Sequence, residues 1–334
     1  MNHRHDLDVA LASCLELPEP DPDAAPLAQA LGRAGLRASV MAWDDPAADW
    51  SRARLAVLRS TWNYPLDRAR FLGWAEGVDR VSRLWNPLET LRWNTHKSYL
   101  LDLESAAVPV VPTVLLRRGS ARTLDEIRNA RGWTDVVVKP AVSAASYRTM
   151  RVTPDRAAEG ARHLEKLLEQ RDVLVQLYLP SVEDHGERAL IWIDGALTHA
   201  VRKSPRFAGQ EESVSSRAVP ISDAEARLAR LALDAAPRPL LYARIDVAPG
   251  PAGPPVVMEL ELVEPSLFFP IGGNAEGSFP LGPVAGWPGC GACPVPGCCG
   301  GVWKIELDLL SPPGAAGSSS AGALGSKMPP AGLA

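Results

Sequence analysis

Glu259 and Glu261 stand two residues apart in an apolar run, so in a β-strand both side chains leave on the same face. Met258 then takes the opposite face. Residues 240–247 and 256–262 are both apolar, and the stretch between them is mostly Pro and Gly. The pattern predicts an antiparallel hairpin with one carboxylate-bearing face.

A hairpin that is symmetric about this turn brings further charges to the same face. Asp246 lies opposite Glu259. By the same count, Arg244 lies opposite Glu261. Carboxylates a few ångströms apart raise one another's pKa unless a cation joins them. Hard oxygen ligands of this kind suit Mg²⁺ that bridges nucleotide phosphates, whereas a solvated strand face with a cross-strand Arg–Glu pair is the structural alternative.

A lysine that ends a buried strand is the second chemical feature. Residues 136–140 predict that strand and contain Lys139. The following residues, 141–149, are small and hydroxyl-rich, so their N–H and O–H groups can come close to a phosphate. Lys97 adds a second cation in the first turn of a helix that we expect to open at residue 94 or 95. Surface and turn positions are the alternative for both lysines.

The elements that position these groups begin with a series of βα units. Strands are predicted at 8–11, 38–42 and 55–58, with a helix at 24–34, which indicates a parallel sheet. Polar and aromatic loops follow the later strands, where an open α/β sheet places a ligand. Trp62, Asn63, Tyr64 and Trp85 can line an amino-acid pocket there, or they serve only turns and packing.

The middle of the chain predicts a mixture of strands and helices. A charged helix ends near 164–169, and a buried strand over 173–180 is stopped by proline. Strands at 188–193 and 197–201 are joined by Asp194-Gly195, a strong two-residue hairpin signal. His199 falls within the second of these strands, and a strand residue is a better interpretation of it than a general base.

Composition excludes several classes of protein. The 334 residues carry a net charge of −4, so no overall basic field exists to hold a nucleic acid backbone. No apolar run approaches the ~18 residues that a membrane helix requires. The N-terminus shows no signal-peptide pattern, so we expect a cytoplasmic protein with neither nucleic acid nor membrane as partner.

The last part of the chain differs from the rest. Residues 270–334 contain 15 glycines and 10 prolines, a composition typical of low-complexity, disordered chain. Cys290, Cys293, Cys298 and Cys299 suggest a zinc site, but the spacer between the two pairs is too short for the usual ligand arrangement. A solvated tail, or one produced by a shifted reading frame, is the simpler interpretation. Within it, 302–310 alone is apolar enough for a short helix or strand.

The order of these motifs resembles the ATP-grasp superfamily. The resemblance is strongest to glutathione-synthetase-like carboxylate–amine ligases and, among them, to the D-cycloserine-forming ligases. It covers about residues 8–269 and rests on an ordered set of motifs: Lys97, Val137-Val138-Lys139-Pro140, Gln176 to Pro180, Gly186-Glu187, Ile193-Asp194-Gly195, Val201-Arg202-Lys203-Ser204-Pro205, Asp246 and Met258-Glu259-Leu260-Glu261.

This resemblance implies an α/β and α+β fold. Residues 1–94 would form a parallel-sheet pre-ATP-grasp domain on the substrate side. Residues 95–269 would form a two-lobed ATP-grasp domain with an antiparallel metal-binding hairpin and a lid at about 110–180. Residues 270–334 would be the low-complexity tail.

The resemblance also implies the site and its cofactors, ATP and Mg²⁺, with Mn²⁺ as an alternative metal. Its implied ATP-binding residues are Lys97 and Lys139 on the phosphates, Ser143, Ser146 and Thr149 on the loop above them, Gln176, Leu177 and Tyr178 in the adenine hinge, and Glu187 beside the ribose. Its implied catalytic residues are Arg202, Lys203 and Arg244, and its implied metal ligands are Asp246, Glu259 and Glu261. Many relatives have Asn where Glu261 stands, and Ser and Ala here replace the family's glycine-rich loop.

Three functions are compatible with these features. The first is an ATP-dependent ligase that joins a small-molecule carboxylate to an amine through an acyl-phosphate, as a peptide-like amide or as a ring. The second is a nucleotide-binding protein without ligase turnover, because the chain beyond Phe269 lacks the expected final helix. The third is a phosphotransferase on the same scaffold. Relatives are often dimers or tetramers, so a homo-oligomer is an open expectation.

Overall fold

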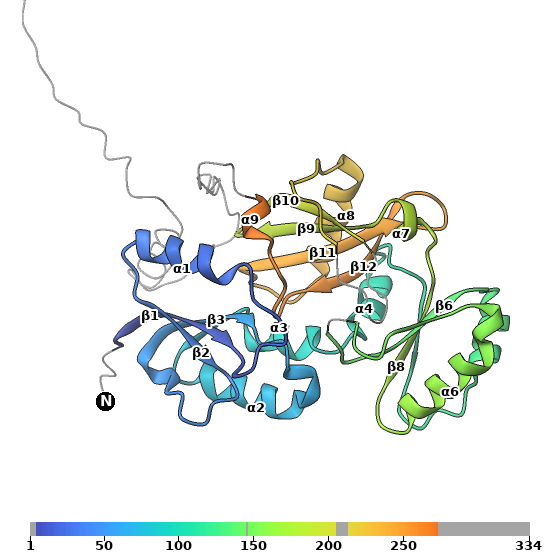
Figure 1. The fold of residues 1–334 in the computed structure, drawn as a ribbon, viewed down its shortest axis with the longest axis horizontal. Coiled ribbons are helices and arrows are strands. Elements are labelled where there is room, and N and C mark those ends of the chain that lie inside the picture. Colours follow the sequence, from blue (N-terminus) through green and yellow to red (C-terminus); the bar gives the residue numbers. More distant parts are fainter. Residues whose placement is uncertain (1–4, 145, 205–212, 273–334) are drawn as a thin grey trace, which may run out of the picture.

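The computed structural model describes residues 5–144, 146–204 and 213–272, whose strands form three four-stranded sheets in succession along the molecule (Figure 1). The strands are β1 (Leu7–Ser13), β2 (Ala38–Ala42), β3 (Ala53–Ser60), β4 (Arg83–Trp85), β5 (Thr113–Leu116), β6 (Val136–Pro140), β7 (Met150–Val152), β8 (Val173–Leu177), β9 (Glu187–Ile193), β10 (Ala196–Lys203), β11 (Tyr242–Pro249) and β12 (Pro255–Glu261). The helices are α1 (Ala24–Arg33), α2 (Arg68–Asp79), α3 (Leu88–Asn94), α4 (Tyr99–Ser105), α5 (Leu124–Arg131), α6 (Ala157–Leu168), α7 (Ser181–Asp184), α8 (Asp223–Ala235) and α9 (Phe269–Gly272).

The first sheet is parallel, in the order β2-β1-β3-β4, and confirms the predicted N-terminal unit. Its central strand is buried on both faces, which explains its continuous apolar sequence. Val9 and Leu11 pack with Leu31 of α1. Ala10 and Ala12 pack on the other face, in the core that contains α2. We call the elements from β1 to α3 the N-terminal unit.

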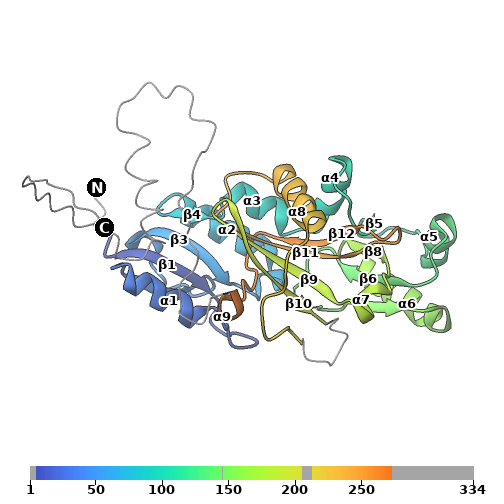
Figure 2. The ribbon, with the colours of Figure 1, turned by 90° about the horizontal axis from the view of Figure 1, so that it is seen from above.

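The second sheet is antiparallel, in the order β10-β9-β11-β12, and lies in the middle of the molecule (Figure 2). One face packs against α4 and α8 in the largest core. The predicted hairpin between β9 and β10 is present, and both of its turn residues have positive φ, 44° at Asp194 and 93° at Gly195. These values fit the two-residue turn that the Asp-Gly pair predicts.

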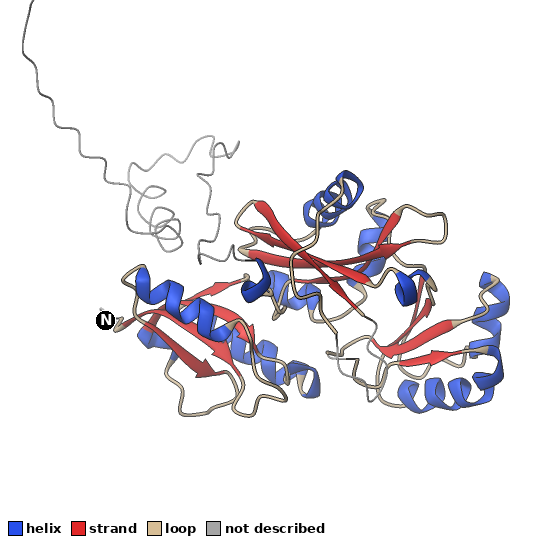
Figure 3. Cartoon of the chain, turned by 45° about the horizontal axis from the view of Figure 1, so that its top comes forward, coloured by secondary structure: helices blue, strands red, loops and turns tan. Residues whose placement is uncertain are grey.

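The third sheet, in the order β5-β8-β6-β7, is also antiparallel, and because it lies within the segment predicted as the lid, we refer to it as the lid. Helices α5 and α6 lie on its outer side, at the far end of the molecule from the N-terminal unit (Figure 3). Thr123 and Glu126 form a capping box that begins α5, and Leu124 and Ile127 bury its apolar side. The mixture of one parallel and two antiparallel sheets confirms the predicted fold class.

Three local predictions were wrong. Lys97 lies in the turn between α3 and α4, because α3 already ends at Asn94 and α4 begins only at Tyr99. Strand β8 ends at Leu177 rather than at Pro180, since the chain turns into α7. A bulge opposite the junction of Asp246 and Val247 gives β12 an extra residue, so Met258 leaves the expected face and packs beside Leu177.

The end of the described chain also departs from the expected boundary. Helix α9 begins at Phe269, the predicted last residue of the ATP-grasp domain, and continues to Gly272. The cysteines of the proposed zinc alternative and the apolar segment 302–310 lie outside the described residues. Among the residues that the structure does describe, no helix has the length and apolar character needed to cross a membrane.

Candidate active site

The second and third sheets, together with loops of the N-terminal unit, contribute side chains to one cavity of about 740 Å³. Every residue that the sequence predicted for the site, except Arg202 and the buried Trp85, lines this cavity. The predicted residues that line it are Lys97, Lys139, Ser143, Ser146, Thr149, Gln176, Leu177, Tyr178, Glu187, Lys203, Arg244, Asp246, Glu259 and Glu261. The cavity also reaches Trp62, Asn63 and Tyr64 of the N-terminal unit.

The hairpin of β11 and β12 has the register that its symmetry predicted. Asp246 pairs with Glu259 and Arg244 pairs with Glu261 across the two strands. The bulge leaves this part of the register unchanged because the extra residue, Met258, precedes Glu259. The four charged side chains therefore share the face that lines the cavity.

Glu259 is the meeting point of two lysines from different parts of the chain. Lys97 Nζ lies 2.9 Å from Oε2, and Lys139 Nζ lies 2.7 Å from Oε1. Burial alone would raise the pKa of Glu259, but the two ammonium groups hold it well below its usual range. Burial also opposes the charge of Lys97, yet Glu259 raises the pKa of Lys97 above its ordinary value. The Glu259 carboxylate and the Lys97 ammonium group are therefore ionised in the free protein.

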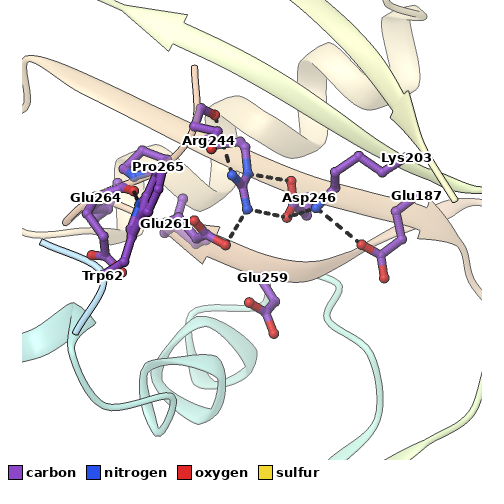
Figure 4. Close-up of polar contacts among 12 residues, drawn as sticks. Trp62, Glu187, Lys203, Arg244, Asp246, Glu259, Glu261, Glu264 and Pro265 are labelled. Atoms are coloured by element: carbon purple, nitrogen blue, oxygen red, sulfur yellow. Dashed lines mark hydrogen bonds and ion pairs between the residues drawn. The ribbon is translucent and has the colours of Figure 1, made fainter. Parts of the chain in front are cut away.

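Asp246 is held by two cations in the same way (Figure 4). Lys203 Nζ lies 2.7 Å from Oδ2, and Arg244 donates to both carboxylate oxygens at 3.0 and 3.1 Å. Arg244 and Lys203 overcome burial and lower the pKa of Asp246. Arg244 also pairs with Glu261, and Lys203 lies 3.4 Å from Glu187. Burial raises the pKa of both glutamates in spite of these partners.

The carboxylates fit a magnesium site in chemistry, although each is now paired with a protein cation. Asp246, Glu259 and Glu261 present hard oxygen atoms on one face, which is the donor type that Mg²⁺ prefers. Within 5–144, 146–204 and 213–272, no group of three or more acidic, His or Cys side chains is already gathered as ligands. Lys97, Lys139, Lys203 and Arg244 hold the carboxylates instead, so they would have to exchange these partners for phosphate oxygens.

The apolar end of the cavity presents unused main-chain groups. Leu177 N–H donates to Pro112 O at 3.0 Å, so the Leu177 carbonyl faces Pro112 in the ladder. Proline has no N–H, and Pro112 therefore cannot donate to that carbonyl. Leu179, two residues on, lies beyond the end of β8, and in a continued strand its N–H would face the same side. This acceptor and this donor belong to residues that line the cavity and pack in the same apolar cluster as Met258.

The remaining predicted hinge side chains have structural partners. Gln176 Nε2 donates to Thr113 Oγ1 at 2.9 Å, which fixes the amide within the lid sheet. Tyr178 donates to Glu183 at 2.8 Å and stacks under Arg151, whose guanidinium carbon lies 3.7 Å from the ring centre. Their side chains shape the wall of the cavity.

Arg202 is the predicted catalytic residue that the structure does not bring to the cavity. Its guanidinium donates to the carbonyl of His185 at 2.6 Å and to that of Asp184. Side chains alternate along β10, so Lys203 and Arg202 must leave on opposite faces. His199 also lies outside the site, because its Nε2 lies 3.0 Å from the Leu267 carbonyl oxygen in a buried position.

The loops of the N-terminal unit form the other end of the cavity. Trp43 and Asp44 hold the Asn63 side chain at 2.6 and 2.7 Å. Trp62 Nε1 donates to the main-chain oxygen of Glu264 at 3.1 Å. Glu264 lines the cavity and was not predicted from the sequence. No local pattern marks it, because a residue three positions after Glu261 does not continue the two-residue alternation of Glu259 and Glu261.

Comparison with known proteins identifies a matching family model, a similar protein sequence and a similar solved structure. The family model described as the N-terminal domain of D-cycloserine synthetase DcsG matches residues 9–86. The cycloserine biosynthesis protein DcsG of Streptomyces lavendulae is 34% identical over 265 residues, 74% of this chain and 88% of that protein. The crystal structure of D-cycloserine synthetase DcsG is similar with a TM-score of 0.73 and 33% identity, over 79% of this chain and 94% of the other.

A more distant structure shares the fold alone. The ATP-grasp ligase PsnB, solved with a phosphomimetic variant of its minimal precursor, Mg and ADP, is 18% identical. The similarity has a TM-score of 0.53 and covers 78% of this chain and 92% of PsnB.

Proposed function

The chain belongs to the ATP-grasp ligases related to D-cycloserine synthetase, ATP-dependent enzymes that form C–N bonds, and from this premise we propose an acyl-phosphate route on an amino-acid-like substrate. The carboxylate of that substrate would be phosphorylated by ATP and then joined to an amine. When one molecule carries both groups, the product would be a ring.

The observation that supports this proposal best is the charge balance at the centre of the cavity. Four cations pair there with four carboxylates: Lys97, Lys139, Lys203 and Arg244 with Asp246, Glu187, Glu259 and Glu261. A triphosphate alone would add uncompensated negative charge to this balanced site. A triphosphate that arrives with metal cations keeps the balance, because the cations join the carboxylates and the phosphates join the lysines.

Each part of ATP has a region of the cavity that fits it. The Leu177 carbonyl and Leu179 N–H can receive the exchangeable edge of adenine next to Met258. Glu187 lines the same cavity, and we assign it to the ribose, one of whose hydroxyls would donate to it. Lys97 and Lys139 would hold phosphate oxygens, and Asp246, Glu259 and Glu261 would hold Mg²⁺, which neutralises phosphate charge when bound.

The reaction then needs little covalent chemistry from the protein. A substrate carboxylate oxygen attacks the γ-phosphorus, the bond to the bridging oxygen breaks, and ADP leaves with an acyl-phosphate remaining. A neutral amine attacks the acyl carbon, phosphate leaves, and the amine loses a proton. Lys203 and Arg244 lie where they can offset the charge of the phosphoryl group. Closure of the lid over Ser143 and Thr149 would exclude water from the acyl-phosphate.

The direct test is ADP release from the full chain with ATP and a panel of amino acids, with and without Mg²⁺ and with Mn²⁺ in its place. Hydroxylamine should trap the acyl-phosphate as a hydroxamate. Amide or lactam formation identifies a ligase. A phosphorylated product that is stable to amines would identify a phosphotransferase, and ATP binding without ADP release would identify a protein without turnover.

The phosphate assignment has its own test. Lys139→Ala should weaken ATP binding by about 10- to 100-fold, the equivalent of about 1.5–3 kcal/mol for a charge-assisted hydrogen bond. Lys166→Ala, which removes an exposed lysine from α6 of the same lid, is the matched control. Equal ATP affinity in both folded variants would remove Lys139 from the site.

A further inference from the structure

Glu264 places a carboxylate in the cavity that none of the steps above uses. It lies beyond the end of β12, and with Trp62 it stands at one end of the row of charged residues that ends at Lys203 and Glu187 (Figure 4). The indole of Trp62 fixes the main chain at this point through its hydrogen bond to the Glu264 carbonyl. The backbone of Glu264 is therefore fixed by this hydrogen bond, while its side chain lines the cavity.

Glu264 differs from the other acids of the cavity centre in its partners. Asp246, Glu187, Glu259 and Glu261 each lie within ion-pair distance of a lysine or arginine. Across the part of the chain that the structure describes, no such ion pair is formed by Glu264. Burial and then the charge of Glu261 raise the pKa of its carboxyl to about 8. The free protein therefore carries a carboxyl group that is costly to ionise, as is common for groups that act on a ligand.

The surroundings of Glu264 leave few other groups to recognise an amine. The amide of Asn63 is occupied by Trp43 and Asp44, and the indole of Trp62 is committed to a carbonyl. Glu16 also lines the cavity but is exposed at its rim. Glu19, from the same loop as Glu16, lines the cavity and is exposed as well, so Glu264 is the least exposed of these three carboxylates.

We propose that Glu264 is the specificity-determining residue for the ammonium group of the substrate, which its carboxylate receives beside the activated carboxylate. The inference rests on the proposed ligase function and adds to it the residue that distinguishes an amino acid from a carboxylic acid without the α-amine. A positive group at this point would give Glu264 an ion-pair partner such as the other acids already have, and the new ion pair would offset the free-energy cost of ionising Glu264.

Two probe molecules isolate this contact. 2,4-Diaminobutyrate and 4-aminobutyrate both carry a carboxylate and an amine that can close a five-membered ring, and they differ only in the α-ammonium. In the wild type, ADP release with each enantiomer of the first should exceed that with the second by at least about 10-fold in kcat/KM, one charge-assisted hydrogen bond. In Glu264→Gln this preference should fall to within about twofold while the KM for ATP stays within about twofold.

Two control variants and a binding measurement distinguish a specific role of Glu264 from a general loss of activity. Glu16→Gln, at the rim, should retain the preference, and Glu264→Asp should restore part of it. Calorimetric binding of both probes in the presence of Mg²⁺ and a non-hydrolysable ATP analogue gives the same comparison without turnover. An unchanged preference in a folded Glu264→Gln would overturn the inference, whereas absence of ADP release with intact probe binding would count only against the ligase function.

Discussion

The N-terminal unit and the lid both contact the hairpin of β11 and β12, but they do so with different chemistry. On the N-terminal side, Asn86 donates to the carbonyls of Tyr242 and Leu262 at 3.0 and 2.7 Å and accepts from Leu241 N–H. Asn94 makes a similar buried pair of bonds with the strand. These are neutral side chains locked to main chain, and a ligand offers no substitute for them.

On the lid side, the contact that reaches furthest into the cavity is an ion pair. Lys139 of β6 holds Glu259 of β12 at 2.7 Å. A phosphate oxygen can take the place of Glu259 as the partner of Lys139, and a metal cation can take the place of Lys139 as the partner of Glu259. The comparison supports the proposal that the contacts on the N-terminal side are permanent and that those on the lid side would exchange when nucleotide binds.

The largest expected effect lies on the permanent side, at Asp23. This fully buried carboxylate accepts from the main-chain N–H groups of residues 267, 268 and 269 at 2.5 to 3.2 Å and pairs with Arg59 at 3.3 Å. Asp23→Ala should destabilise the protein by about 3–5 kcal/mol, because it leaves Arg59 as an unpaired buried charge. Chemical denaturation measures this. Asp234→Ala, at an exposed pair on α8, should cost far less.

The next effect tests the exchangeable side. Glu259→Gln should lower metal-free stability by about 1.5–3 kcal/mol, because Lys97 and Lys139 lose their charged partner. Glu261→Gln should leave stability equal or slightly higher, because burial already raises the pKa of Glu261. Both variants should lose Mg²⁺-dependent turnover. Differential scanning calorimetry in a chelating buffer measures the metal-free stability of the two variants. An equal loss of stability in both would show that Glu261 is a structural partner of Arg244.

A smaller effect, this time a gain in stability, is expected when Glu264 is substituted, because its carboxyl group is costly to ionise in the folded protein. Its pKa is raised to about 8 by burial and by Glu261, against Lys97 and Arg244. Between about pH 4.5 and 8 the folded state holds a proton that the unfolded state has lost, so stability falls as pH rises through this window. Glu264→Gln should therefore raise Tm, more at pH 8.5 than at pH 5. A gain that is constant with pH would show that ionisation of Glu264 costs nothing.

The smallest effect is expected where the lid is joined by an ordinary hydrogen bond. Ser181 Oγ of α7 donates to the Pro249 carbonyl at 2.7 Å in a half-buried position. Ser181→Ala should cost no more than about 1 kcal/mol. A loss as large as that of Asp23→Ala would show that the lid is fixed as firmly as the N-terminal unit, and the contrast would fail.

The sequence could predict the features of the hairpin that depend on local signals. The facing of Arg244, Asp246, Glu259 and Glu261 follows from alternation and from one Pro/Gly turn, which are local signals. The bulge at Met258 leaves no such mark, because an extra residue in a strand looks like any other apolar position.

Contacts between distant segments were equally hidden. Asp23 is one acid in a loop, and its partners lie 244 to 246 residues further along the chain. Lys97 was found by resemblance, but the turn that carries it was not, since the end of α3 at Asn94 is set by bonds from that side chain to Leu260 and Leu262. Local pattern predicts which face a side chain takes, and tertiary partners decide the rest.

The contact between Asp23 and residues 267–269 also has a consequence for folding during synthesis: the N-terminal unit cannot complete its packing until these residues have been made. The N-terminal sheet leaves the ribosome first, yet the groups that satisfy Asp23 and Arg59 lie in residues 265–269 and emerge last among the described elements. Until then both charges need water, so they resist burial and the N-terminal unit cannot finish packing. A nascent chain that stops short of this segment would lack a completed cavity, which ties the appearance of an ATP site to the near-complete translation of the ordered chain.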